Sequence, residues 1–335
     1  MRTASSSFAR RTSLAAIVAA SMALGASAPA AFAQDGTGAA TPTPPSACQI
    51  VPAEAADASA TPATDDTPAA TPASGERTIP VVFIGGDGED SDAAATDPLA
   101  LDLEAASTAI TGCLSVGQYD TLVQIAGDDY LGQLIGLGAP VTADEFIILA
   151  PMLPEVPYQL ISVENATRTS DTTATADVTY ELAHQVRLST WQFELQEIDG
   201  QQVWTLQGET AMTPEAPEGT DTLTVEIGAE GYTIADNTVQ GPSVAIEASN
   251  TDDADHEVLV LRLDGATTDD ILAHAEPGLP QGVAYIGQAT VPAGSSGTLL
   301  LSGLQPGTYT IVDLLPNAQG LPNLSGGMEI TFEVE

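Results

Sequence analysis

The chain has 335 residues, and its 46 acidic residues against seven basic ones give a formal net charge of −39 at pH 7. All seven basic residues are arginine, which excludes Schiff-base chemistry and the lysine of a phosphate-binding loop. Such a polyanion repels nucleic acid and anionic lipid headgroups, so we expect neither as a partner. Its charge favours cations and a well-solvated acidic exterior.

The first 33 residues have the layout of a secretory signal peptide. A basic start that includes Arg10 and Arg11 precedes an apolar run over 14–24, and Ala31-Phe32-Ala33 offers an Ala-x-Ala cleavage site. The run is too short to span a bilayer, so we expect cleavage after Ala33 and no stable membrane insertion. The mature protein is then secreted, periplasmic or held at the cell surface. The arginine pair fits either the twin-arginine route or an ordinary charged start.

Residues 34–95 form an arm rich in Ala, Thr, Pro and Asp, which has too few large apolar side chains to fold and is predicted to be disordered. A short strand candidate lies at 79–84. The acidic run at 87–92 lacks the ligand order of a calcium loop. Cys48 and Cys113 are the only cysteines, so in an exported chain we expect one disulfide between them.

Helical signals follow the arm. Asp97 can cap a helix that starts at Pro98, carries an apolar face through Leu103 and Ile110, and ends at Gly117. Shorter helices are predicted at 120–125, at 129–135 and after a Thr142–Glu145 capping box.

Beyond Pro157 the hydrophobic period changes to two. Apolar and polar residues alternate over 174–182 and 191–196, and Asp199-Gly200 marks a tight hairpin that returns through 203–206. Helices followed by an antiparallel meander predict an α+β domain.

This order of elements over residues 96–212 resembles the NTF2-like (SnoaL-like) family. The resemblance also rests on the Gly-Gln-Tyr-Asp turn at 117–120, the Asp-Asp-Tyr-Leu at 128–131 and the Asp-Gly-x-x-x-Trp hairpin at 199–204. It implies an α+β cone, in which three helices pack into a curved sheet. The interior of such a cone can hold a small apolar ligand, and some relatives carry out proton transfer there with a carboxylate and a tyrosine.

The candidate ligand-binding residues of this cone are Tyr130, Tyr180 and His184, with Asp129 as the candidate carboxylate. None of them belongs to a catalytic motif, so we assign no catalytic residue. The alternative interpretation makes Tyr180 a core residue and His184 a surface residue at a strand end.

Residues 213–220, rich in Pro, Glu and Gly, form a predicted linker, and residues 221–335 read as an all-β sandwich. One helix is expected at 267–275, with Thr267 as its cap. The short strands are expected at 223–227, 244–248, 257–263, 288–291, 297–301, 309–312 and 329–334.

This last domain resembles the cupredoxin-like family. The residues that carry the resemblance are Asn250 with His256 at a strand start, Val291-Pro-Ala-Gly294, Pro306-Gly-Thr-Tyr309, Gly320-Leu-Pro-Asn323 and Gly327-Met328. In copper-binding members the ligands are two His, one Cys and one Met. His256 and Met328 match two of these positions, the Cys position falls at Asp313, and the second His position falls at Pro316 or Asn323.

Blue-copper chemistry needs a thiolate and two imidazoles beside a weak axial thioether. No cysteine follows Cys113, and the other histidines, His184 and His274, lie in the cone and on the predicted helix. We therefore expect no type 1 copper site and no cofactor. His256 and Met328 are the residual candidates for weak copper binding.

The sequence thus predicts a multidomain protein: an α+β NTF2-like cone followed by an all-β cupredoxin-like sandwich, with a disordered N-terminal arm. We expect an exported cell-surface or extracellular binding or accessory protein, whose partner is a small molecule or a surface protein. The alternatives are a periplasmic or extracellular copper-handling or electron-transfer protein, and an NTF2-like enzyme.

Overall fold

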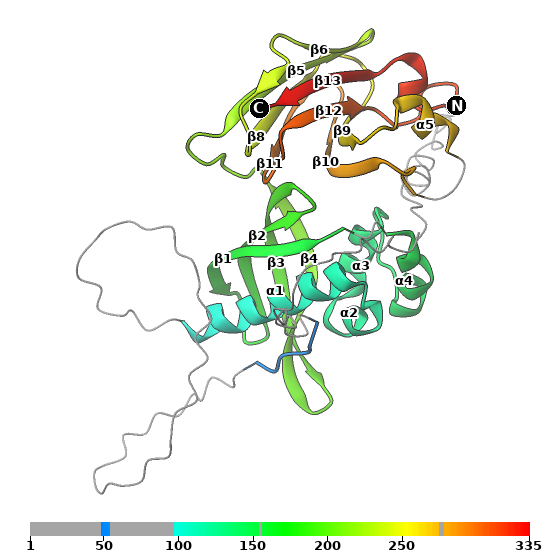
Figure 1. The fold of residues 1–335 in the computed structure, drawn as a ribbon. Coiled ribbons are helices and arrows are strands. Elements are labelled where there is room, and N and C mark those ends of the chain that lie inside the picture. Colours follow the sequence, from blue (N-terminus) through cyan, green and yellow to red (C-terminus); the bar gives the residue numbers. More distant parts are fainter. Residues whose placement is uncertain (1–47, 54–96, 154–155, 275–277) are drawn as a thin grey trace, which may run out of the picture.

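The computed structural model of the chain describes residues 48–53, 97–153, 156–274 and 278–335 (Figure 1). The predicted signal peptide at 1–33, the strand candidate at 79–84 and the acidic run at 87–92 lie outside the described residues.

Residues 48–53 are the described part of the arm, and there the structure differs from the predicted disorder. The expected disulfide is present: Cys48 is bonded to Cys113, with 4.4 Å between the two Cα atoms. The backbone N–H of Ala53 also donates to the carbonyl of Gln202 (2.7 Å). These two attachments hold the segment against the fold.

Helices occupy the next part of the chain: α1 (Pro98–Val116), α2 (Tyr119–Ile125), α3 (Asp128–Leu134), α4 (Ala143–Leu149) and the short η2 (Ala150–Met152). As predicted, α1 starts where Asp97 Oδ1 accepts from the N–H of Leu99 (3.0 Å), and it ends at Gly117 in the left-handed region. The predicted Thr142–Glu145 capping box starts α4. By length and apolar composition α1 alone among the described helices could span a membrane, but 56% of that stretch is buried in the fold, as in a core helix.

Strands β1 (Tyr158–Arg168), β2 (Thr173–Leu182), β3 (Gln185–Ile198) and β4 (Gln201–Met212) pair in sequence as an antiparallel meander. Every second residue of β2 is buried, as its alternation predicts. The buried face of the meander packs against the helices, and one core cluster joins the two layers (Figure 1). Its largest fully buried side chains are Trp191, Trp204, Phe146 and Phe193.

The second half of the described chain is the predicted β-sandwich. One of its layers has the strand order β11 (Ser296–Leu301), β8 (Val244–Asn250), β5 (Asp221–Gly228), β6 (Gly231–Ile234). The other has the order β10 (Val283–Val291), β9 (His256–Leu263), β12 (Gly307–Val312), β13 (Glu329–Val334), β7 (Thr238–Val239). A second core cluster fills the space between the layers. Helix α5 (Thr268–Ala273) and the short η3 (Asn323–Gly326) lie in its connections.

The two halves share one sheet, which the sequence did not predict. The start of β3 pairs with the end of β11, with Val186 opposite Leu300 and Gln185 opposite Leu301. The meander and one layer of the sandwich thereby form a continuous eight-stranded sheet. Gly287 of β10 lies against this junction: a Cβ there would be 2.9 Å from Leu301 Cδ2 and 3.1 Å from Gln185 Cβ.

Candidate functional site

His256, the first residue of β9, is buried and held from both sides by carboxylates. Its Nδ1 lies 2.7 Å from Asp313 Oδ2, and its Nε2 lies 3.1 Å from Asp252 Oδ2. Asp252 belongs to the turn between β8 and β9, and Asp313 follows β12 directly. Asp252 therefore links this turn to the His256 ring.

Asp313 is fully buried, with 0% of its surface exposed, and its carboxylate has several donors. Besides His256, Asn323 Nδ2 donates to Oδ2 (2.9 Å), and the backbone N–H of Leu315 donates to Oδ1 (2.8 Å). These contacts account for the hydrogen-bonding capacity that burial would otherwise leave unmet. The side chains of His256, Asp313 and Asn323 form one hydrogen-bonded cluster, which we call the His256–Asp313–Asn323 network.

The electrostatics of the network favour a charged imidazole. Burial alone lowers the pKa of His256, but hydrogen bonds to Asp313 and Asp252 outweigh it, so the pKa lies above its ordinary value. Both ring nitrogens face carboxylate oxygens, and both can donate only in the imidazolium form. Next to it, burial raises the pKa of the Glu257 carboxyl to about 7, against the opposing effect of the Leu314 N–H, which donates to it.

These residues do not fit a blue-copper ion. The position where the resemblance calls for a thiolate is a carboxylate, Asp313, and the one imidazole present uses both nitrogens in hydrogen bonds. Asp252 and Asp313 contact opposite nitrogens of the ring, so they cannot converge with it on one ion. Among the described residues no group of three or more His, Cys, Asp or Glu side chains is placed to hold a metal ion. Met328 is buried in the core of the sandwich.

A second polar cluster lies inside the α+β half. Tyr130 of α3 and Tyr180 of β2 both contact the ring of Trp191, with centroid distances of 6.3 and 5.7 Å. The Tyr180 hydroxyl donates to Glu209 Oε2 (3.2 Å). Burial raises the pKa of Glu209, and the charge of Arg187 opposes this rise. Tyr180 and Glu209 thus form a hydrogen-bonded, partly buried pair that can share a proton.

Arg187 connects this cluster to the sandwich. It lies opposite Tyr180 in the sheet register, its Nη2 donates to Gln185 Oε1 (3.4 Å), and its Nε is buried without a hydrogen-bond partner in the described structure. The charge of Arg187 also acts on Tyr285 of β10: burial raises the pKa of Tyr285 to about 12, and the positive charge of Arg187 opposes this rise.

Of the three predicted ligand residues, Tyr130 and Tyr180 come together at Trp191, whereas His184 and the candidate carboxylate Asp129 lie elsewhere. His184 sits in the β2–β3 turn, where its Nδ1 is 3.0 Å from the carbonyl of Ser302 in the sandwich half. Asp129 is exposed in the first turn of α3. The sequence interpretation missed Glu209 and Arg187. The alternation of β3 could have placed Arg187 on the inward face, because it is an even number of positions from the inward-facing Trp191.

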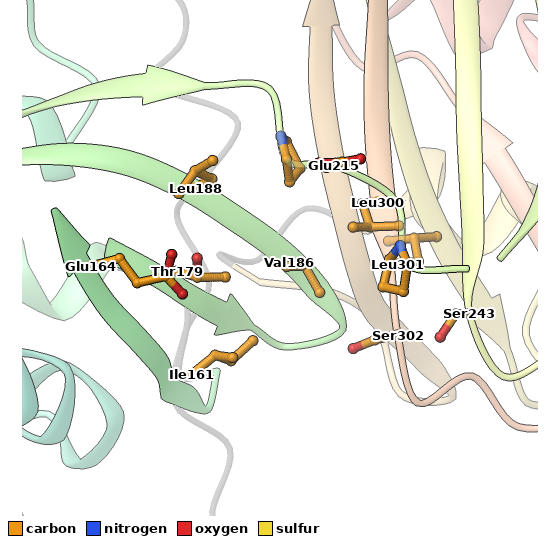
Figure 2. A pocket seen from close by; sticks show the side chains of 12 residues that line it. Ile161, Glu164, Thr179, Val186, Leu188, Glu215, Ser243, Leu300, Leu301 and Ser302 are labelled. Atoms are coloured by element: carbon orange, nitrogen blue, oxygen red, sulfur yellow. The ribbon is translucent and has the colours of Figure 1, made fainter. Parts of the chain in front are cut away.

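The structure also contains a cleft of about 350 Å³ at the junction of the two halves (Figure 2). The outer face of the meander and the end of β11 form its walls. Its lining residues are Ile161, Glu164, Thr179, Val186, Leu188, Pro214, Glu215, Pro217, Ser243, Leu300, Leu301 and Ser302.

Comparison with known proteins finds no matching family model and no matching curated protein. Solved structures do match part of the chain. Reduced auracyanin from Roseiflexus castenholzii is 19% identical, covers 35% of this chain and 98% of its own, and gives a TM-score of 0.25. Auracyanin A, a "blue" copper protein from Chloroflexus aurantiacus, is 18% identical, with coverages of 34% and 99% and a TM-score of 0.24. A multi-copper oxidase from Pediococcus acidilactici is 15% identical, with coverages of 48% and 38% and a TM-score of 0.24.

Proposed function

We propose that this chain is an exported binding or accessory protein whose cupredoxin-like sandwich works without copper. In this proposal residues 1–33 direct export, residues 96–212 form an NTF2-like domain, 213–220 a linker and 221–335 the sandwich. The net charge of −39 suits a protein that meets cations or other surfaces outside the cell rather than nucleic acid.

One observation supports the proposal: the buried carboxylate of Asp313, at the position where the family resemblance calls for the copper thiolate, accepts hydrogen bonds from His256, Asn323 and Leu315. A carboxylate is a hard ligand and gives no thiolate-to-copper charge transfer. Because His256 and Asn323 both donate to Asp313 Oδ2, the residues at the ligand positions satisfy one another. A copper ion would have to break a buried ion pair and leave buried donors unpaired, which opposes binding.

Copper titration tests the proposal. Purified protein is titrated with Cu(II), and with Cu(I) in competition with a chelator, while visible absorption and electron spin resonance are recorded. We expect no intense blue absorption and no stoichiometric tight binding. His256→Ala and Met328→Ala are compared with His274→Ala, which changes a histidine outside the network. Tight binding of one copper ion that is lost in His256→Ala or Met328→Ala but kept in His274→Ala would overturn the proposal in favour of copper handling.

A further inference from the structure

The cleft at the junction arises from an exchange of strand partners. Strand β4 pairs with β3 as far as Met212 opposite Leu188, and β11 then pairs with β3 from Leu300 opposite Val186. The chain leaves β4 at this point and crosses to β5 through residues 213–220. Pro214, Glu215 and Pro217 of this linker form one wall of the cleft.

The floor of the cleft is apolar and partly open to solvent. Ile161 lies at a β-bulge in β1, where the pairing with β2 shifts between Leu160 and Ser162, and 52% of its surface is exposed. Val186 and Leu188 of β3 continue the surface, and Leu300 of β11 closes it (Figure 2). Apolar side chains gathered in a concave surface form the usual body of a ligand site.

The charged residues of the cleft are all acidic. Glu164 of β1 and Glu215 of the linker lie in its lining, and no basic residue does. Arg187 stands between Val186 and Leu188 in sequence, but successive residues of a strand point to opposite faces, so its charge belongs to the buried tyrosine cluster. An occupant therefore meets an apolar floor and two carboxylates.

We propose that this cleft binds a small organic cation: an amine or quaternary ammonium group attached to an apolar body. The apolar body covers Ile161 and Leu188, and the cationic group lies between Glu164 and Glu215. The volume of about 350 Å³ is at the lower end of ligand pockets, which fits a compact molecule. This inference rests on the proposal that the chain acts by binding, and it names the site and the ligand class.

The test uses three probes with the same chain length, octyltrimethylammonium, octanol and octanoate; the two ionic probes are kept below their micellar concentrations and octanol below its solubility limit. Isothermal titration of the full mature chain at low salt should give the tightest binding for the ammonium probe and the weakest for octanoate. Each exposed carboxylate contributes about two- to fivefold to the preference for the cation over the alcohol. High salt should reduce this preference, because the carboxylates are accessible to solvent.

Two changes separate the charge from the apolar floor. Glu164→Gln with Glu215→Gln should bring the affinity for the ammonium probe to that for octanol and leave octanol unchanged. Ile161→Ser, at a position with 52% of its surface exposed, should weaken the binding of all three probes about tenfold. The matched control is Glu329→Gln with Glu333→Gln, which removes two exposed carboxylates from β13 in the other sheet and should leave every affinity unchanged.

Each contrary outcome is distinct. Equal affinity for ammonium and octanoate, or an equal loss in the control pair, would overturn the cation preference. If Ile161→Ser still weakened octanol, binding at the cleft would stand without that preference. No binding of any probe, or no effect of Ile161→Ser, would overturn the cleft as a site. The copper titration would still test the copper-free function of the sandwich, because it does not depend on this cleft.

Discussion

Replacing Asp313 by Ala should destabilise the sandwich strongly, because Asp313 is the centre of a buried charged network. The change leaves a buried His256 imidazolium without its 2.7 Å partner and removes the acceptor of Asn323 Nδ2 and the Leu315 N–H. Breaking a buried ion pair from one side costs about 3–5 kcal/mol. Three separate hydrogen-bond losses would sum to more, but they belong to one network and do not add. We therefore expect a loss of about 4 kcal/mol, a large part of the stability of a typical domain.

The assay can locate this loss in the fold. Both tryptophans, Trp191 and Trp204, lie in the α+β half, whereas far-ultraviolet circular dichroism reports on both halves. In urea titrations, Asp313→Ala should shift the dichroism transition more than the fluorescence transition. A double-mutant cycle with His256→Ala should give a coupling energy of about 3 kcal/mol. The exposed Asp269→Ala is the control. A loss below about 1 kcal/mol, or no coupling, would refute the view that this network holds the sandwich together.

Three further predictions concern stability. Glu257 has a pKa of about 7 in the fold and an ordinary value of 4.5, so between these values the folded state holds a proton that the unfolded state has lost. Stability therefore falls as pH rises through this window, by about 3 kcal/mol in total. The raised pKa of His256 also makes stability fall as pH rises above 6.5. Urea midpoints should therefore decrease from pH 5 to pH 8, and Glu257→Gln should flatten the part below pH 7; a rise with pH would contradict this sign. The Cys48–Cys113 disulfide closes a sequence separation of 65 residues, so its reduction should lower the free energy of unfolding by at most about 4 kcal/mol. Urea unfolding followed by tryptophan fluorescence with and without reductant measures this loss, and Cys48→Ser/Cys113→Ser is the control that reductant should not affect. Gly132→Ala places a Cβ 2.1 Å from the Ala139 carbonyl oxygen and should lower the free energy of unfolding by about 2–3 kcal/mol. Gly138→Ala, whose Cβ would have nothing within 4 Å, should change the midpoint of the fluorescence transition little. Equal effects of the two variants would contradict this packing argument.

Local signals predicted much of this fold because they act within a few residues. The Asp97 cap, the left-handed Gly117 and the Thr142–Glu145 box each fix a helix end through hydrogen bonds that need no tertiary partner. The alternation of 174–182 survives in β2 because one face of that strand is buried along its whole length. The disulfide followed from the presence of only two cysteines in a chain expected to be exported.

What the sequence did not predict depends on contacts between distant residues. Strand β1 carries two register shifts, which break its hydrophobic period. The joining of the two halves rests on a β3–β11 pairing of two residue pairs, too short to leave a pattern in either segment. The partners of His256 are Asp252 and Asp313, which lie 4 and 57 positions away in the sequence and follow the ends of other strands. A carboxylate in a turn does not reveal in sequence which side chain it contacts.

A proton–nitrogen correlation spectrum of the histidine side chains at pH 6, before and after one equivalent of Cu(I), tests whether His256 is held by carboxylates and closed to copper. We predict that both ring nitrogens of His256 carry protons, as the contacts to Asp313 and Asp252 require, and that copper leaves these signals in place. A His256 ring with one bare nitrogen whose resonances shift on addition of Cu(I) would contradict it.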